Sequence, residues 1–184
     1  MLKRCAPYGL SCLIGVVSVL GFAPFSWPPF LIGAWAWLFW KLERETDAKR
    51  AFLHSYAFGT GQFIAGLYWI GHSTLIDAAQ WAWAWPFAVL VLPLLFSLYP
   101  GIAGYLTVRL KLARLPSAML LFTLAEIARG TLFTGFPWNL VGTTWIDVPW
   151  VAQNADWAGI WGLTAITYLL AALLAQFKSP RSLA

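Results

Sequence analysis

The chain has 184 residues, of which 60% are apolar and only 10% are charged, and its mean hydropathy is +0.70. Soluble globular domains carry about 25% charged residues, so this composition excludes an ordinary water-soluble domain. Twelve Lys and Arg against seven Asp and Glu give a net charge of +5. On so apolar a chain, that excess indicates the anionic face of a membrane rather than nucleic acid.

Six apolar segments are long enough, or nearly so, to cross the roughly 30 Å hydrocarbon core of a bilayer. We expect an all-α, polytopic transmembrane helix bundle that forms one domain over residues 1–184. Its membrane segments are Cys5–Ala23, Trp27–Trp40, Ala51–Ile70, Trp85–Val108, Leu115–Phe133 and Trp157–Phe177. The second segment would extend only about 21 Å as a helix, which leaves open whether it spans fully. In the fourth, Pro93 predicts a kink.

The basic residues are distributed unevenly between the two ends of these segments. If the N-terminus is cytoplasmic, eleven of the twelve Lys and Arg residues fall in cytoplasmic loops or at cytoplasmic span ends. The segments that face the other way, residues 24–26, 72–84 and 134–156, contain neither Lys nor Arg. This pattern predicts cytoplasmic N- and C-termini and an even number of crossings.

Ten of the thirteen tryptophans fall at or near the outer boundary in this topology, and Trp35, Trp37 and Trp40 lie toward the inner one. An aromatic belt at the lipid–water boundary is the simpler explanation. The alternative is a docking surface for outer-leaflet lipid or for a periplasmic domain. The ten are Trp27, Trp69, Trp81, Trp83, Trp85, Trp138, Trp145, Trp150, Trp157 and Trp161.

Glu126 and Arg129 are charged residues inside the fifth apolar segment, three positions apart and therefore on one face of a helix. An ionisable pair at that depth indicates a functional site, although a structural ion pair that holds this helix against its neighbours is the competing interpretation. Arg129 precedes the outward loop Thr134–Trp138 by about one turn. A guanidinium in this position could reach a phosphate or an ester carbonyl.

The remaining polar residues do not form a recognisable catalytic set. His54 and His72 lie near opposite ends of the third segment without a Cys, Asp or Glu at metal-ligand spacing, and we expect both at the membrane interface. Gly59, Gly61 and Gly66 are expected to permit close helix packing. No catalytic residue, metal site or cofactor is predicted.

Several motifs of the chain resemble the apolipoprotein N-acyltransferase family. They include Gly21–Phe25, Gly59–Gly61, Gly66–Ile70 and Glu126–Gly130, and the most specific is Thr134–Trp138 followed by Gly142. Gln153, Gly159 and Gly162 resemble the family's next helix. The order and spacing agree over nearly the whole chain.

The resemblance implies a multi-pass enzyme of the bacterial inner membrane. Its substrates would be a phospholipid acyl donor and a lipoprotein whose N-terminal diacylglyceryl-cysteine receives the acyl group. In the family, a periplasmic nitrilase-like domain with a Glu-Lys-Cys triad performs the chemistry, and the membrane helices position the lipids. The residues expected to shape the lipid site are Glu126, Arg129, Phe136, Pro137, Trp138 and Trp69.

The sequence departs from the family because its 184 residues contain no region that could hold this triad. Its two cysteines, Cys5 and Cys12, lie at the inner end of the first segment, without a neighbouring base. We therefore expect this chain alone to transfer no acyl group. It would be the membrane half of a truncated or split enzyme, whose nitrilase-like domain is either separately encoded or lost. The alternative is a non-enzymatic lipid-binding scaffold or a small transporter.

Overall fold

The computed structural model describes residues 2–177 of the chain, with side chains from Pro7 onward. Every regular element among those residues is a helix, which confirms the predicted all-α class. The longer helices are α1 (Leu2–Ser18), α2 (Pro28–Arg44), α3 (Ala48–Leu67), α7 (Leu98–Arg109), α8 (Arg114–Thr131) and α10 (Ala155–Phe177). Shorter helical turns are η1 (Val19–Gly21), α4 (Ile70–Ser73), α5 (Ala78–Trp81), η2 (Ala82–Ala84), η3 (Phe87–Val91), α6 (Leu92–Phe96), η4 (Leu132–Thr134), η5 (Val141–Trp145) and α9 (Pro149–Ala152).

Each of the six predicted apolar segments contains a helix, but the helices differ in their ability to cross a membrane. Within the described residues, two stretches are both long and apolar enough to span, Ala78–Arg109 with 32 residues and Ala155–Phe177 with 23. Helix α2 has seventeen residues and begins with two prolines, which are tolerated in a first helical turn. It extends about 26 Å, so its full passage through a bilayer stays a prediction.

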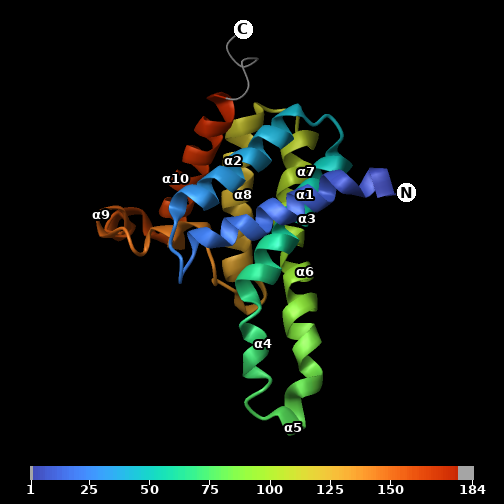
Figure 1. Ribbon diagram of the computed structural model, residues 1–184. Coiled ribbons are helices and arrows are strands. Elements are labelled where there is room, and N and C mark those ends of the chain that lie inside the picture. Colours follow the sequence, from blue (N-terminus) through green and yellow to red (C-terminus); the bar gives the residue numbers. More distant parts are fainter. Residues whose placement is uncertain (1, 178–184) are drawn as a thin grey trace.

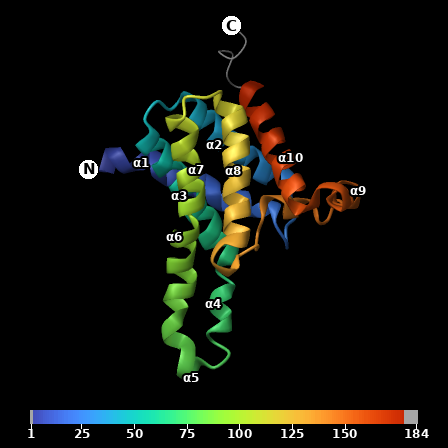
Figure 2. The same ribbon diagram turned by 180° about the vertical axis from the view of Figure 1, so that it is seen from behind.

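The helix connections lie at two opposite ends of the molecule (Figure 1). The α2–α3 and α7–α8 connections and the last turn of α10 lie at one end of the molecule, and the hairpin that carries α4 and α5 extends beyond the other end. Figure 2 shows the same separation from behind. Helix α1 lies across the other helices in both views, so the six crossings stay a prediction, as does the cytoplasmic assignment of the first end. The C-terminus lies outside the described residues.

The helix that leads from the hairpin into the bundle is irregular near Pro93, at the position where the sequence predicts a kink. Residues Phe87–Val91 form a π-helical turn immediately before α6. Proline has no N–H to donate to the helical ladder, so an irregular turn beside it is expected. Farther on, the Ser97 hydroxyl donates to the Pro93 carbonyl at 2.6 Å, where α6 gives way to α7.

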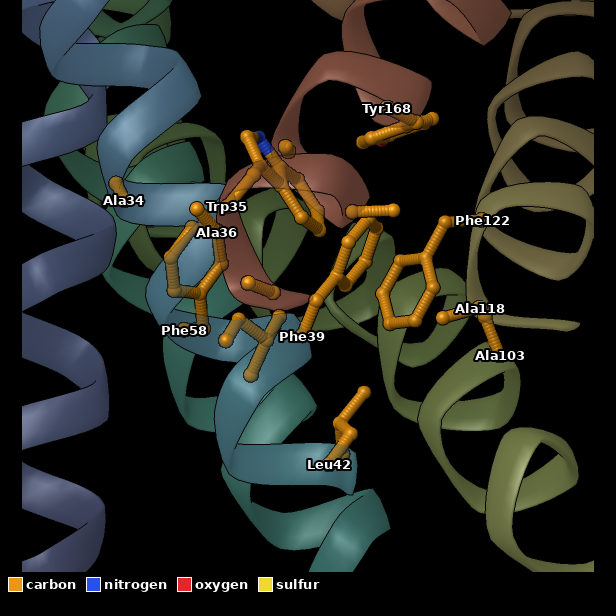
Figure 3. Close-up of a cluster of buried hydrophobic side chains, with 14 of the residues drawn as sticks. Ala34, Trp35, Ala36, Phe39, Leu42, Phe58, Ala103, Ala118, Phe122 and Tyr168 are labelled. Atoms are coloured by element: carbon orange, nitrogen blue, oxygen red, sulfur yellow. The ribbon is translucent and has the colours of Figure 1, made fainter. Parts of the chain in front are cut away.

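An aromatic cluster forms the centre of the bundle (Figure 3). The Trp35 ring of α2 lies 4.6 Å from Phe58 of α3, 5.3 Å from Phe122 of α8 and 4.9 Å from Tyr168 of α10, measured between ring centroids. Phe39 packs against the Phe122 and Tyr168 rings. Trp35 is only 3% exposed, so it does not face lipid as a residue of an aromatic belt would, and its place toward the inner boundary stays a prediction. Trp35 instead joins four helices at their common core.

Helices α1 and α3 approach so closely that their crossing requires glycine. A Cβ atom at Gly61 would lie 2.0 Å from the backbone oxygen of Cys12, and one at Gly15 would lie 2.0 Å from that of Phe58. Glycine removes this obstacle and lets the two backbones touch, as in the close pairs of membrane helices. The expectation that glycines in the third segment serve helix packing is confirmed at Gly61.

Candidate functional site

Glu126 and Arg129 form a buried ion pair on α8, with 3.0 Å between Glu126 Oε1 and Arg129 Nη2. Arg129 Nη1 donates two further hydrogen bonds, to the carbonyls of Phe136 at 2.8 Å and Trp138 at 2.9 Å. The second carboxylate oxygen of Glu126 accepts the backbone N–H of Val141 at 2.9 Å. Both charged groups therefore hold the loop that follows α8.

This loop has an unusual backbone. Phe133, Thr134 and Asn139 have φ angles of 53°, 79° and 50°, in the left-handed region that residues other than glycine rarely occupy. At Gly135 the φ angle is 77°, and a Cβ atom there would lie 2.3 Å from the carbonyl oxygen of Gly130. Such conformations cost about 1–3 kcal/mol each and persist where surrounding contacts hold them. The ion pair holds the loop at Phe136, Trp138 and Val141, next to these positions in the chain.

Trp69 and Trp138 meet at the edge of the loop. Their ring centroids are 5.4 Å apart and their planes are inclined at 74°, an edge-to-face arrangement that aromatic pairs prefer. The Trp69 indole N–H donates to the carbonyl of Gly66 at 3.1 Å, and the Asn139 side chain donates to the same carbonyl at 2.9 Å. The loop is thereby fastened to the end of α3 as well as to α8.

A row of aromatic rings continues from the loop into the bundle. Phe136 stacks on Phe96 of α6 with 4.5 Å between centroids, and Phe96 contacts Phe63 of α3 at 6.1 Å. The guanidinium carbon of Arg129 lies 5.0 Å from the centroid of the Phe63 ring, within the range of a cation–π interaction. Arg129 is thus held by a ring, a carboxylate and two carbonyls.

A cavity of about 700 Å³ lies between this loop and the helices α6 and α7. Its wall is almost entirely apolar, and Arg129 is the charged residue in it. The volume falls in the range of about 300–1,000 Å³ that is typical of small-molecule sites. The lining residues are Leu92, Leu95, Phe96, Leu98, Tyr99, Ile102, Arg129, Leu132, Phe133, Thr134, Gly135 and Phe136. Such a wall suits an elongated apolar ligand.

The structure brings the six predicted site residues into one region. Glu126, Arg129, Phe136 and Trp138 are linked by the ion pair and its hydrogen bonds, and Trp69 joins them through Trp138. Pro137 is exposed, lies between Phe136 and Trp138 in the sequence and is not part of the cavity wall. The contacts of Arg129 are those of a structural ion pair, which was the competing interpretation.

Sequence reasoning missed three residues that complete the region, Phe63, Phe96 and Asn139. The two phenylalanines carry no pattern that sets them apart from other aromatic residues of apolar segments. Asn139 gave a usable signal, because an amide directly after the Thr134–Trp138 motif is suited to a left-handed backbone position.

His54 is buried between helices and not exposed on the surface, and its expected depth at the membrane interface stays a prediction. Its ring is 3% exposed, and its Nδ1 lies 2.8 Å from the Ser11 hydroxyl of α1. The Tyr8 ring packs against the His54 ring, with 4.8 Å between the ring centroids. An interhelical hydrogen bond compensates the burial of the imidazole. The sequence does not indicate this bond, because its two residues are 43 positions apart. His72 is exposed at the start of the hairpin.

Comparison with known proteins identifies the family. The family model described as apolipoprotein N-acyltransferase N-terminal domain matches residues 14–173. A protein named apolipoprotein N-acyltransferase from Rhizobium rhizogenes is 35% identical over 85% of this chain, and its namesake from Rhodopseudomonas palustris is 34% identical over 93%. The namesake from Brucella melitensis is 38% identical over 82%.

The match covers only part of these relatives. The aligned region is 32% of the Rhizobium rhizogenes and Rhodopseudomonas palustris proteins and 29% of the Brucella melitensis protein, so the chain spans about a third of the curated relatives it matches. The family model nevertheless covers most of this chain, including α8 and the loop after it. The chain therefore belongs to the apolipoprotein N-acyltransferase family, and the part it represents is the family's N-terminal domain.

Proposed function

We propose that this chain is the membrane part of an apolipoprotein N-acyltransferase. It sits in the bacterial inner membrane as a multi-pass bundle and positions a phospholipid acyl donor and a diacylglyceryl lipoprotein for transfer of the acyl chain. The observation that carries the proposal is the apolar cavity of about 700 Å³ beneath a loop that the Glu126–Arg129 pair holds in place. The membership of the chain in the family supports it.

The chemistry of the cavity favours an acyl chain over a polar ligand. Leucine, isoleucine and aromatic side chains make up most of its wall. Transfer of an acyl chain from bilayer to cavity gains little from the hydrophobic effect, because lipid is as apolar as the wall. Selectivity must then come from the shape of the cavity and from the polar groups of its wall, which include Arg129 and the loop at Thr134 and Gly135. The Trp69–Trp138 pair acts on this wall through the loop that Trp138 belongs to.

The covalent steps belong to another part of the enzyme. The cavity wall contains no cysteine, lysine or glutamate, so it offers no acyl-accepting thiol and no paired base. We place these groups in a nitrilase-like domain with a Glu-Lys-Cys triad, which is the domain that the family resemblance implies. Under this proposal, the present chain binds lipid and the nitrilase-like domain forms the thioester.

Lipid binding by the purified chain tests the proposal. The chain is placed in nanodiscs, and binding of a fluorescent diacyl phospholipid is measured for the wild type and for the combined variant Arg129→Ala, Trp138→Ala. The combined variant should bind at least about tenfold more weakly, a loss of about 1.4 kcal/mol. Unchanged binding would count against the assignment of this region as the lipid site.

A matched control separates the site from general effects of aromatic residues. Trp150 is 75% exposed on α9 and does not line the cavity, so Trp150→Ala should bind phospholipid as the wild type does. The same preparation, given phospholipid and a diacylglyceryl lipopeptide, should form neither a thioester nor an N-acylated product. Product formation by this chain alone would refute the proposal that a separate nitrilase-like domain performs the covalent steps.

A further inference from the structure

A second, much smaller cavity lies behind Arg129. Its volume is about 10 Å³, and its wall comes from five helices, α2, α3, α7, α8 and α10. Arg129 and Tyr99 line both cavities and so form the partition between them. Whereas the larger cavity is apolar, the smaller one is bordered by Gln62, Glu126 and the indole of Trp35.

Polar atoms without a partner gather around this small cavity. The amide nitrogen and oxygen of Gln62, the Nε of Arg129 and the indole nitrogen of Trp35 are buried and have no hydrogen-bond partner within the protein. The three residues are only 2%, 2% and 3% exposed. A buried polar group left unpaired costs about 1–3 kcal/mol, so several on one wall indicate that something else satisfies them.

We propose that the small cavity binds a single water molecule that connects Gln62 of α3 to Arg129 of α8. A cavity of about 10–15 Å³ accommodates one water, provided that two to four polar partners surround it. A water oxygen accepts two hydrogen bonds and its hydrogens donate two. It can therefore accept from Arg129 Nε and from one further N–H of the wall, and donate to the Gln62 carbonyl oxygen.

The bound water completes the support of the loop after α8. Arg129 uses Nη1 for the loop carbonyls and Nη2 for Glu126, which leaves Nε as the guanidinium nitrogen that has no hydrogen-bond partner within the protein. With water on Nε, the guanidinium is fixed from behind as well as from the side of the loop. Gln62 thereby acts as a positioning residue through the water, and this assignment holds whether or not the larger cavity binds lipid.

The direction in which Gln62→Met changes the melting temperature distinguishes a cavity that contains water from an empty one. Gln62→Met keeps the length of the side chain and removes its amide. If the cavity is dry, the change deletes two unsatisfied polar atoms and the melting temperature in detergent should stay the same or rise. If water bridges Gln62 and Arg129, the change leaves Arg129 Nε unpaired, and the melting temperature should fall by about 3 °C or more.

The control is Gln80→Met, since Gln80 is an exposed glutamine on α5. This variant should melt within about 1 °C of the wild type. A fall for Gln62→Met beyond that of the control supports the bound water, and an unchanged or higher melting temperature overturns it.

Radiolytic labelling of the wild type tests the same inference without any substitution. X-rays convert bound water into hydroxyl radicals, which modify an aromatic ring beside them. Tyr168 lines the small cavity and is 1% exposed, whereas Phe39 is 0% exposed and does not line it. Modification of Tyr168 clearly above that of Phe39 supports water in the cavity. Equal, background labelling of both rings would overturn it.

Discussion

Arg129 and Glu126 are three residues apart on α8, and both form hydrogen bonds with the loop that follows this helix. The guanidinium donates to the carbonyls of Phe136 and Trp138, while the carboxylate accepts the N–H of Val141. The pair therefore fixes the position of the loop, and its two charges neutralise each other within the bundle. This relationship explains why two charges are retained in a segment that is otherwise apolar.

Single and double replacement of the pair should give clearly non-additive losses of stability. Removal of one partner leaves the other charge buried without compensation, which costs about 3–5 kcal/mol. Glu126→Met and Arg129→Met should each lower the melting temperature strongly, and the double variant should lose less than the sum of the two. Thermal unfolding in detergent measures all three. Additive losses would show that the two side chains act independently.

The positions of the helices were predictable because apolar runs must be buried or face lipid, and each of the six runs contains a helix. The Glu126–Arg129 contact was also predictable, since a spacing of three residues places two side chains on one helical face. Both results follow from local sequence and need no knowledge of how the helices pack.

The contacts between distant segments were not predictable from the sequence. Trp35 near a basic helix end looks like an interfacial residue, and only the packing of α3, α8 and α10 around it shows that it is buried. Phe63 and Phe96 reach Phe136 through tertiary contacts that no local pattern encodes. The left-handed backbone at Phe133 escapes prediction too, because that residue type disfavours it.

Introducing a methyl group at Gly61 should separate α1 from α3. The new Cβ would meet the backbone of Cys12, which cannot move aside as a flexible side chain does, so Gly61→Ala should cost at least about 1–3 kcal/mol. Gly33→Ala is the control, because Gly33 lies in α2 with open space around it. Alanine there should be neutral or stabilising by up to about 1 kcal/mol. Chemical or thermal unfolding compares the two.

Filling the larger cavity should weaken phospholipid binding without disturbing the fold. Ile102 lines this cavity from α7 and is 52% exposed, so Ile102→Trp has room to project into it. Affinity for a fluorescent phospholipid should fall about tenfold, while the melting temperature stays near that of the wild type. Leu120 is 55% exposed on α8 outside the cavity, and Leu120→Trp should bind normally. Equal losses in both variants would indicate a general effect on the surrounding lipid.

Accessibility of new cysteines should reveal the orientation of the bundle. Lys49 and Gln80 are both exposed, Lys49 at the start of α3 and Gln80 on α5 at the tip of the hairpin, at opposite ends of the molecule (Figure 1). The positive-inside rule places Lys49 in the cytoplasm and Gln80 outside it.

In a chain whose two native cysteines are replaced by alanine, a membrane-impermeant maleimide added to spheroplasts should label Gln80→Cys at once. It should label Lys49→Cys only after the membrane is opened. The reverse order would invert the predicted topology, and labelling of both before opening would place the two ends on one side of the membrane.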